Sequence, residues 1–156
     1  MSQSGAELAR LLLGGYRKLV DAAIAEMAAR GYEEVRPVHE FTMRAIAAGA
    51  TTTSEVARRM SVSKQAAAKT IAVLQERGYV TSAADPADPR RNRIEVTERG
   101  FAMMREGEAI FDDLRAEWER QIGAPALALL ESQLTAFVGD SGIRLQEPGW
   151  AAQAAG

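Results

Sequence analysis

The sequence predicts a mainly α-helical chain with one small antiparallel hairpin of two or three strands. Two short amphipathic segments lie within residues 52–77 and are separated by Ser61-Val62-Ser63. Residues 79–81 and 94–96 then alternate in polarity, as strands do, on both sides of a loop rich in proline and arginine. Long stripes of apolar residues at helical spacing flank this region. Together these patterns predict a winged helix-turn-helix and a separate helical lobe.

The first of the two short helices is expected to begin at Thr52. Thr52 and Glu55 have the spacing of a capping box, in which each side chain bonds to the backbone of the other residue. Ser63 is a good N-terminal cap for the second helix, which we expect to extend to Arg77. Gly78 follows, where a left-handed cap is common. The residues expected to face the core are Val56, Ala57, Met60, Ala67, Ile71 and Leu74.

One side of the second helix carries small and polar residues of the kind that contact DNA bases. Glutamine can pair with adenine, lysine can reach guanine or phosphate, and alanine methyl groups can touch the thymine methyl group. An alanine-rich helix of a bundle would have a similar composition, so this helix alone leaves both interpretations open. The residues expected to contact DNA here are Ser63, Lys64, Gln65, Ala68 and Lys69.

The loop between the two predicted strands favours the DNA interpretation. It reads DPADPRRNR, with two Asp-Pro steps that mark turns and three arginines at Arg90, Arg91 and Arg93. Arginines at the tip of a hairpin can follow phosphates or enter a minor groove. A charged loop is usually only a solvated surface feature. Its position directly after a helix-turn-helix nevertheless indicates a wing that binds DNA.

Three segments, in this order, resemble the MarR family of bacterial transcriptional regulators. They are TSEVA at 53–57, VSK at 62–64 with LQERGYV at 74–80, and DPADPR at 85–90 with VTERG at 96–100. The resemblance is specific over about fifty residues. Over the rest of the chain it extends only to a matching order of helices.

The wing of this family usually carries an Asp-x-Arg signature, matched here by Asp88 and Arg90. The resemblance implies that Asp88 braces the wing while nearby arginines contact DNA. Pro89 stands where many members have another arginine, and Ala66-Ala67-Ala68 replaces the Ser, Thr or Val that members often carry. The base preference of the family therefore does not carry over to this chain.

The apolar stripes at the two ends of the chain indicate helices that need a partner. One winged helix reads only half of a site, and two-fold symmetry would double its contacts with DNA. In the family that the chain resembles, such helices form a two-fold dimer interface. We therefore expect a homodimer, with packing of all the stripes inside one monomer as the alternative. The stripes comprise Leu8, Leu12, Tyr16, Leu19, Ala23 and Met27; Met104, Gly107, Phe111, Leu114 and Trp118; and Leu127, Leu130, Leu134, Phe137 and Val138.

These patterns divide the chain into four parts. Residues 1–36 are expected to form the N-terminal helix of a dimerisation lobe, and residues 37–100 the winged helix-turn-helix domain. Residues 101–142 would supply the C-terminal helices of the lobe, and residues 143–156, of low complexity, a flexible tail.

A small aromatic effector is expected at the junction of lobe and winged helix, because members of the family commonly bind ligands there. Aromatic acids or phenols would shift the spacing of the two DNA-binding domains and release the DNA. The candidate lining residues are Tyr16, Arg36, His39, Met43 and Phe111.

The distribution of charge agrees with a DNA-binding domain although the chain carries a net charge of −2. Residues 54–100 hold nine Lys or Arg against six Asp or Glu, and the remainder holds ten against fifteen. The excess of positive charge is therefore confined to the predicted winged helix.

Several functional classes are disfavoured by what the sequence lacks. There is no cysteine, so neither a thiol nor a disulfide switch is possible, and one histidine makes a zinc site improbable. Phosphate-binding glycine loops, HExxH and Cys-His pairs are absent, so we expect neither an enzyme nor a cofactor. No run of about eighteen apolar residues and no signal peptide occur, which indicates a cytoplasmic protein without a membrane partner.

The resulting prediction is a sequence-specific transcriptional regulator that acts as a homodimeric repressor on a pseudo-palindromic operator. The alternatives are a winged-helix module that binds a protein and a non-specific architectural DNA-binding module. Substitution of the wing arginines would distinguish these functions, because it should abolish binding to DNA but leave binding to a protein partner unaffected.

Overall fold

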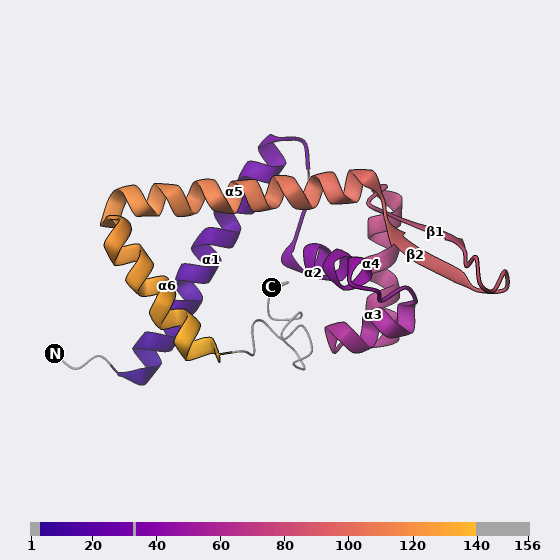
Figure 1. Cartoon of the computed structure of the whole chain (residues 1–156), viewed down its shortest axis with the longest axis horizontal. Helices are drawn as coiled ribbons and strands as arrows, with labels where there is room; N and C mark the ends of the chain where they lie inside the picture. The colour runs from indigo at the N-terminus through magenta and orange to yellow at the C-terminus, as the bar shows by residue number, and fades with distance from the viewer. Residues whose placement is uncertain (1–3, 33, 140–156) are drawn as a thin grey trace.

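The computed structural model describes residues 4–32 and 34–139 of the 156-residue chain. This part contains six helices and a two-stranded antiparallel sheet (Figure 1), which confirms the mainly α fold with a small wing. The expected tail at 143–156 lies outside the described residues. The elements are α1 (Gly5–Ala29), α2 (Pro37–Ala47), α3 (Thr53–Met60), α4 (Lys64–Glu76), β1 (Val80–Ala84), β2 (Asn92–Val96), α5 (Glu98–Ile122) and α6 (Ala124–Val138).

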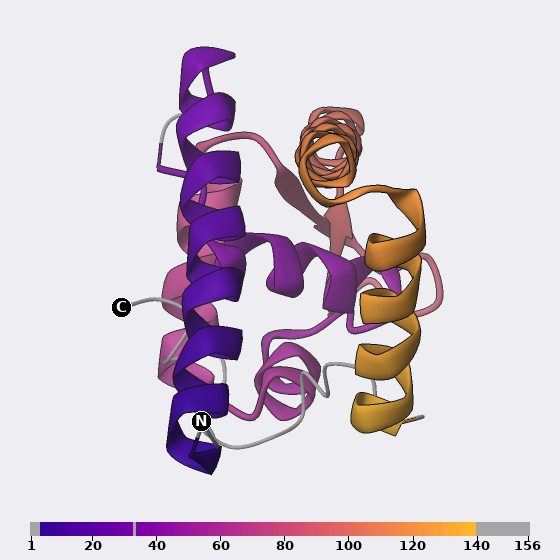
Figure 2. The same ribbon diagram turned by 90° about the vertical axis from the view of Figure 1, so that its left-hand side faces the viewer.

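The helix α5 joins the two halves of the molecule along one long edge. Helices α2, α3 and α4 and the wing gather near its first turns, whereas α6 folds back from its far end (Figure 1). Viewed from that end, α1 and α6 stand on opposite sides, with α2 and α3 seen between them (Figure 2). We call residues 37–100 the winged-helix unit, and α1, α6 and the second half of α5 the helical lobe.

The core of the winged-helix unit comes from the side chains that the helical spacing predicts. Val56, Ala57 and Met60 of α3 and Ala67, Ile71 and Leu74 of α4 are all buried. Both strands contribute to this core, through Val80 of β1 and Ile94 of β2. Strand β2 is fixed to the rest of the unit by the backbone N–H of Ile94, which donates to the carbonyl of Thr51 at 2.8 Å.

The junction between the wing and α5 is packed backbone against backbone at Gly100. A Cβ atom at this position would lie 2.2 Å from the carbonyl oxygen of Tyr79 and 2.7 Å from Cγ1 of Val96. Thr97 fixes the same junction, because its hydroxyl caps α5 and donates to the carbonyl of Gly78 at 2.6 Å. The start of α5 is thereby held firmly to the strands.

The helical lobe is packed less completely than the winged-helix unit. Ala23 and Met27 of α1 are buried against α5, and Leu127 is the one buried residue of α6 among those described. Arg115 of α5 pairs with Glu131 of α6 at 2.6 Å and with Glu119 of its own helix at 3.0 Å. Much of the apolar surface of the lobe stays uncovered in the single chain: Leu8, Leu11, Leu12, Leu13, Trp118, Ile122, Leu129, Phe137 and Val138 are exposed.

Candidate nucleic-acid interface

The helix-turn-helix is positioned by a capping box at its first residue. Glu55 N–H donates to the hydroxyl of Thr52 at 3.2 Å, and the carboxylate of Glu55 accepts from the backbone of Thr52 at 3.2 Å and of Thr51 at 2.7 Å. These backbone hydrogen bonds, that of Thr51 foremost, lower the pKa of Glu55. The start of α3 is therefore determined locally by the sequence.

The turn between α3 and α4 depends on a residue that the sequence did not single out. Ser61 adopts a left-handed conformation, with φ of 50°, at a position where glycine would be the usual choice. Ser63 follows in extended conformation, and its hydroxyl accepts from the backbone N–H of Ala66 at 3.0 Å. Ser63 therefore has a structural role as the cap of α4, besides the DNA contact expected of it.

The outward side of α4 carries the residues that were expected to contact DNA. Its buried side consists of Ala67, Ile71 and Leu74, so the opposite side faces solvent. The exposed residues there are Ser63, Lys64, Gln65, Ala68 and Lys69. Because their side chains are short or flexible, this side can approach a groove closely.

The wing is a regular hairpin whose tip is folded by two aspartates. The strands pair from Val80–Val96 to Ala84–Asn92. Asp85 accepts from the backbone N–H of Ala87 at 2.9 Å, and Asp88 accepts from that of Arg90 at 3.1 Å. The carboxylate of Asp88 thus touches the backbone of the residue with which the family signature pairs it. Its contact with an arginine side chain is made instead to Nε of Arg91, at 4.0 Å.

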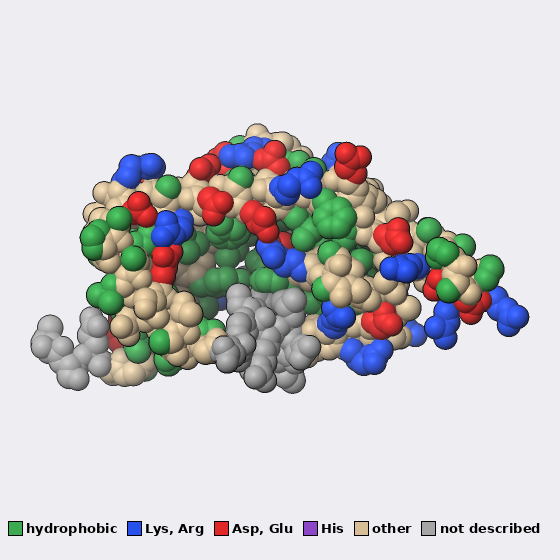
Figure 3. Space-filling model, in the orientation of Figure 1, with side chains coloured by type: hydrophobic (Ala, Val, Ile, Leu, Met, Phe, Trp, Pro, Cys, Tyr) green, Lys and Arg blue, Asp and Glu red, His purple; other side chains and the backbone are tan. Residues whose placement is uncertain are grey.

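The cations of this surface differ in how far their charge is already neutralised. Arg93 lies 3.4 Å from Glu95, and Arg91 is at the limit of an ion pair with Asp88. Among the described residues, no ion pair involves Lys64, Lys69 or Arg90. All five cations are exposed, and Figure 3 shows Lys and Arg side chains at the tip of the wing and along the lower face of the winged-helix unit.

A polar groove between α3, α4 and the wing adds residues that the sequence analysis missed. It has a volume of about 420 Å³ and also contains Lys64 and Ala68 from the predicted set. Asn92 and Ile94 are two residues apart on β2, so their alternation could have indicated that Asn92 shares a face with the core strand position. Gln75 lies seven positions after Ala68 on α4, so helical spacing could have indicated it as well. The remaining additions come from other elements and carry no local signal: Thr52, Thr53, Ser54 and Ser82.

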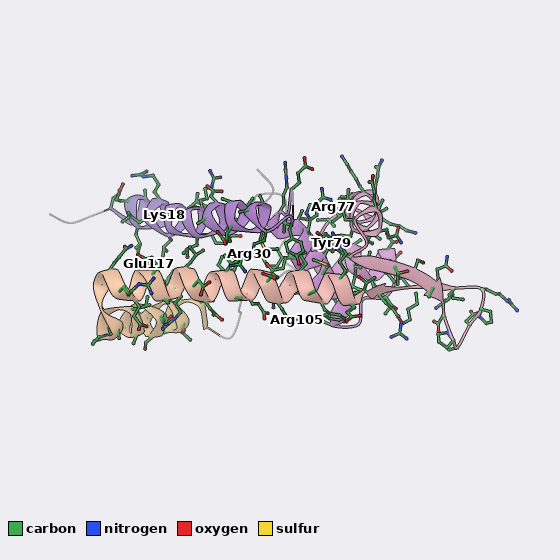
Figure 4. All side chains as sticks on the ribbon, turned by 90° about the horizontal axis from the view of Figure 1, so that it is seen from above. Lys18, Arg30, Arg77, Tyr79, Arg105 and Glu117 are labelled. Atoms are coloured by element: carbon green, nitrogen blue, oxygen red, sulfur yellow. The ribbon has the colours of Figure 1, made fainter. Side chains whose placement is uncertain are left out.

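The end of α4 is tied to the segment between α1 and α2. Arg77 donates to the carbonyl of Glu34 at 3.0 Å and to its carboxylate at 3.2 Å. Arg77 and Tyr79 lie beside the end of α1 at this junction (Figure 4), where the ring of Tyr79 meets that of Tyr32. Glu34 itself has a left-handed backbone, with φ of 55°. The orientation of α4 is thus linked to the connector that leads out of the helical lobe.

A second, apolar cavity of about 410 Å³ lies between α1, α2 and α5. Of the five residues predicted to line an effector pocket, Tyr16, Arg36 and Phe111 line this cavity. His39 and Met43 do not. Both are buried on the other face of α2, where they contribute to the interior of the winged-helix unit.

His39 has a structural role at the start of α2. Its Nδ1 accepts from the backbone N–H of Arg36 at 3.1 Å. Burial, together with the charges of Arg77 and Arg36, lowers the pKa of His39. Within the described residues, no group of three histidine or carboxylate side chains could hold a metal ion, and no helix combines the length and apolar character needed to cross a bilayer.

Part of the sequence is similar to known proteins. Residues 42–91 match the profile of the MarR family. The LexA repressor of Deinococcus radiodurans is 33% identical over 93 residues, which are 60% of this chain and 39% of that protein. The chain thus spans well under half the length of that curated relative.

Solved structures of low sequence identity share the fold of nearly the whole described chain. MarR from E. coli in its apo form superposes with a TM-score of 0.64 at 21% identity, over 85% of this chain and 97% of that one. An S. aureus MepR mutant bound to an oligodeoxyribonucleotide superposes with a TM-score of 0.62 at 15% identity, over 88% and 97%.

Proposed function

We propose that this chain is a regulator of the MarR family, whose model matches residues 42–91 and whose solved structures share its fold, and that it binds specific DNA sequences as a homodimer. One observation carries the proposal: α4 and the wing carry five exposed cations, three of them outside any ion pair among the described residues, and the groove between these elements is lined by Lys64 and further polar groups. The MepR mutant bound to an oligodeoxyribonucleotide supports a role in DNA binding, since it has the same fold.

In the proposed complex, α4 enters a major groove and the wing reaches the adjacent backbone and minor groove. Gln65 and Lys69 would reach base edges, with Ala68 against thymine methyl groups, while Ser63 and Lys64 would bind phosphate. At the wing, Arg90, Arg91 and Arg93 would supply the charge, and Asp88 would hold the tip in shape. The activity is regulatory and not catalytic, with promoter occupancy leading to repression.

The exposed apolar surface of the lobe supports dimerisation. The molecule is hollowed below α5, and hydrophobic side chains line the visible part of the hollow (Figure 3). Monomeric proteins rarely leave so many large apolar side chains open to water. A second copy of α1, α5 and α6 would cover them and present two winged-helix units about one turn of DNA apart, as a pseudo-palindromic operator requires.

The cavity between α1, α2 and α5 is the proposed site of a small effector. It lies where the lobe meets the winged-helix unit, and Tyr16, Arg36 and Phe111 belong to its wall. A ligand that wedges these helices apart would change the spacing of the two units and release the operator. DNA and effector binding would then be linked, each weakening the other.

Binding selection tests the proposed DNA recognition. The full chain is incubated with random duplexes over several rounds at two salt concentrations, and the recovered motif is measured against variants. The double variant Arg90→Ala/Arg91→Ala should bind more weakly and lower the slope of log affinity against log salt by about one unit per lost phosphate contact. The control Arg105→Ala/Arg120→Ala removes two exposed arginines from α5 and should leave both quantities unchanged.

The outcomes separate the regulator from its alternatives. A pseudo-palindromic motif weakened by salt supports the proposal. Salt-sensitive binding without a motif would indicate an architectural DNA-binding protein instead. Absence of binding at both salt concentrations, with a protein partner still bound by the wing variant, would indicate a protein-interaction module.

A further inference from the structure

The wall of the apolar cavity is suited to an uncharged ring system. Apolar side chains from α1, α2 and α5 supply most of it, among them Met27, Phe41, Met103, Met104 and Phe111. Flexible methionines beside aromatic rings can adapt to planar guests of different shape. A cavity of about 410 Å³ is large enough for a fused bicyclic compound.

The polar side chains of the cavity differ in whether they can still bind a ligand. Arg44 is already held by two carboxylates, since it lies 2.8 Å from Glu40 and 3.1 Å from Glu108. Arg36 is exposed to solvent. The side chain of Glu40 is only 24% exposed, and both of its contacts with Arg44 are made through Oε1. Among the described residues, Oε2 of Glu40 is therefore left as an acceptor.

Burial and the charge of Glu40 both disfavour a negative charge at Tyr16. Tyr16 lines the same cavity, and its pKa is raised by burial and by the negative charge of Glu40. An environment that disfavours the tyrosinate also disfavours the anionic group of a ligand placed nearby. A positive charge or a hydrogen-bond donor would instead gain from Glu40, and the low exposure of this carboxylate would strengthen the contact.

We propose that this cavity binds apolar ring compounds that carry a positive charge or a hydrogen-bond donor, and that Glu40 holds that group. The inference deepens the proposed function, on which it rests for the effector role. Of the aromatic acids and phenols expected from the sequence, it disfavours the acids and retains the phenols, which carry a hydrogen-bond donor. A bound cation would compete with Arg44 for Glu40. Because Arg44 also pairs with Glu108, this competition would affect the contact between α2 and α5.

A matched series of naphthalene compounds tests the charge class on the full chain. Naphthylmethylammonium, naphthalenemethanol, naphthylacetate and ethylnaphthalene differ only in the group at the end of a one-carbon arm. Isothermal titration calorimetry should give the highest affinity for the ammonium, then the alcohol, with the carboxylate weakest. Glu40→Gln should lower the affinity for the ammonium by about tenfold or more, because a charge-assisted contact is lost, and leave that for ethylnaphthalene unchanged.

Glu108→Gln is the matched control, because Glu108 also pairs with Arg44 but does not line the cavity. It should retain the affinity of the wild type for the ammonium, and circular dichroism should show both variants folded. Binding of naphthylacetate as tight as that of the ammonium would overturn the proposal, as would an unchanged affinity in Glu40→Gln or no binding by any compound.

The same complexes are then tested for binding to the selected DNA motif. Loss of DNA binding on addition of the ammonium supports both the ligand class and its effector role. Tight, Glu40-dependent binding without any effect on DNA supports the ligand class and removes only the proposed release mechanism. The two proposals can thus fail separately.

Discussion

Large apolar side chains are buried in the winged-helix unit but exposed in the helical lobe. Leu74 of α4 is fully buried at 0% exposure, whereas Leu11 of α1 is 54% exposed and Phe137 of α6 is 76% exposed. The unit completes its core within one chain, using two strands and three short helices. The lobe has longer helices and an incomplete core, so its structure is expected to depend on a second copy of the chain.

The largest expected effect is a loss of folding stability when a buried leucine of the unit is replaced, compared with an exposed leucine of the lobe. Leu74→Ala should lower the free energy of unfolding by about 2–5 kcal/mol, because it leaves a cavity in a closed core. Leu11→Ala should change it by less than about 0.5 kcal/mol at protein concentrations where the chain is monomeric. Urea denaturation of both variants measures the difference. Equal losses would show that the two leucines share one kind of environment.

A second prediction tests whether the exposed leucines of the lobe form a dimer interface. Leu8→Glu with Leu11→Glu places charges on the exposed apolar surface of α1, so the proposed dimer should dissociate while the unit remains folded. Sedimentation velocity would detect the monomer, and affinity for a two-half-site operator should fall by about 10²–10⁴ through loss of bivalency. Ala25→Glu with Ala28→Glu adds the same charge to other exposed positions of α1 and serves as the control. A dimer that survives the leucine variant would disprove this interface.

The smallest expected effect concerns the junction between the two regions. The pKa of His39 is lowered by burial, by Arg77 and by Arg36, while Glu34 acts in the opposite sense. The unfolded chain therefore binds a proton at higher pH than the folded one, and stability is lost as the pH falls through the lowered pKa. Urea unfolding between about pH 8 and pH 5 should show this loss, and His39→Asn, which keeps an acceptor but cannot titrate, should reduce it. An identical pH profile for both proteins would contradict the assignment.

Features set by a few neighbouring residues could be predicted from the sequence. The caps at Thr52 and Ser63 and the left-handed Gly78 are confirmed, because each depends on hydrogen bonds or backbone freedom within about four positions. The two strands are longer than the alternation at 79–81 and 94–96 predicted. Their extension toward the tip contains Ala83, Ala84 and Asn92, which have little intrinsic preference for strands and are held by pairing alone.

Features that depend on distant residues could not be predicted in this way. The lining of the cavity between α1, α2 and α5 is one such feature, since two of the five residues expected at an effector pocket do not line it. His39 and Met43, four residues apart, face the interior, whereas Glu40 and Arg44, each one residue further, line the cavity. Both faces of α2 carry apolar residues, so periodicity alone could not decide between them. The contact of Arg77 with Glu34, 43 positions apart in sequence, likewise leaves no local signal.

The continuity of α5 makes the helix a lever between the two regions. Its 25 residues, at about 1.5 Å each, span roughly 37 Å without a break. With one end fixed to the strands at Gly100, a tilt of about 5° at the other end displaces the winged-helix unit by about 3 Å, close to the rise of one base pair. Rotation about its axis is equally direct, since one inserted residue would turn the unit by about 100° relative to the lobe. Small rearrangements among the lobe helices would therefore displace the winged-helix unit by distances comparable to one base-pair step of a DNA duplex.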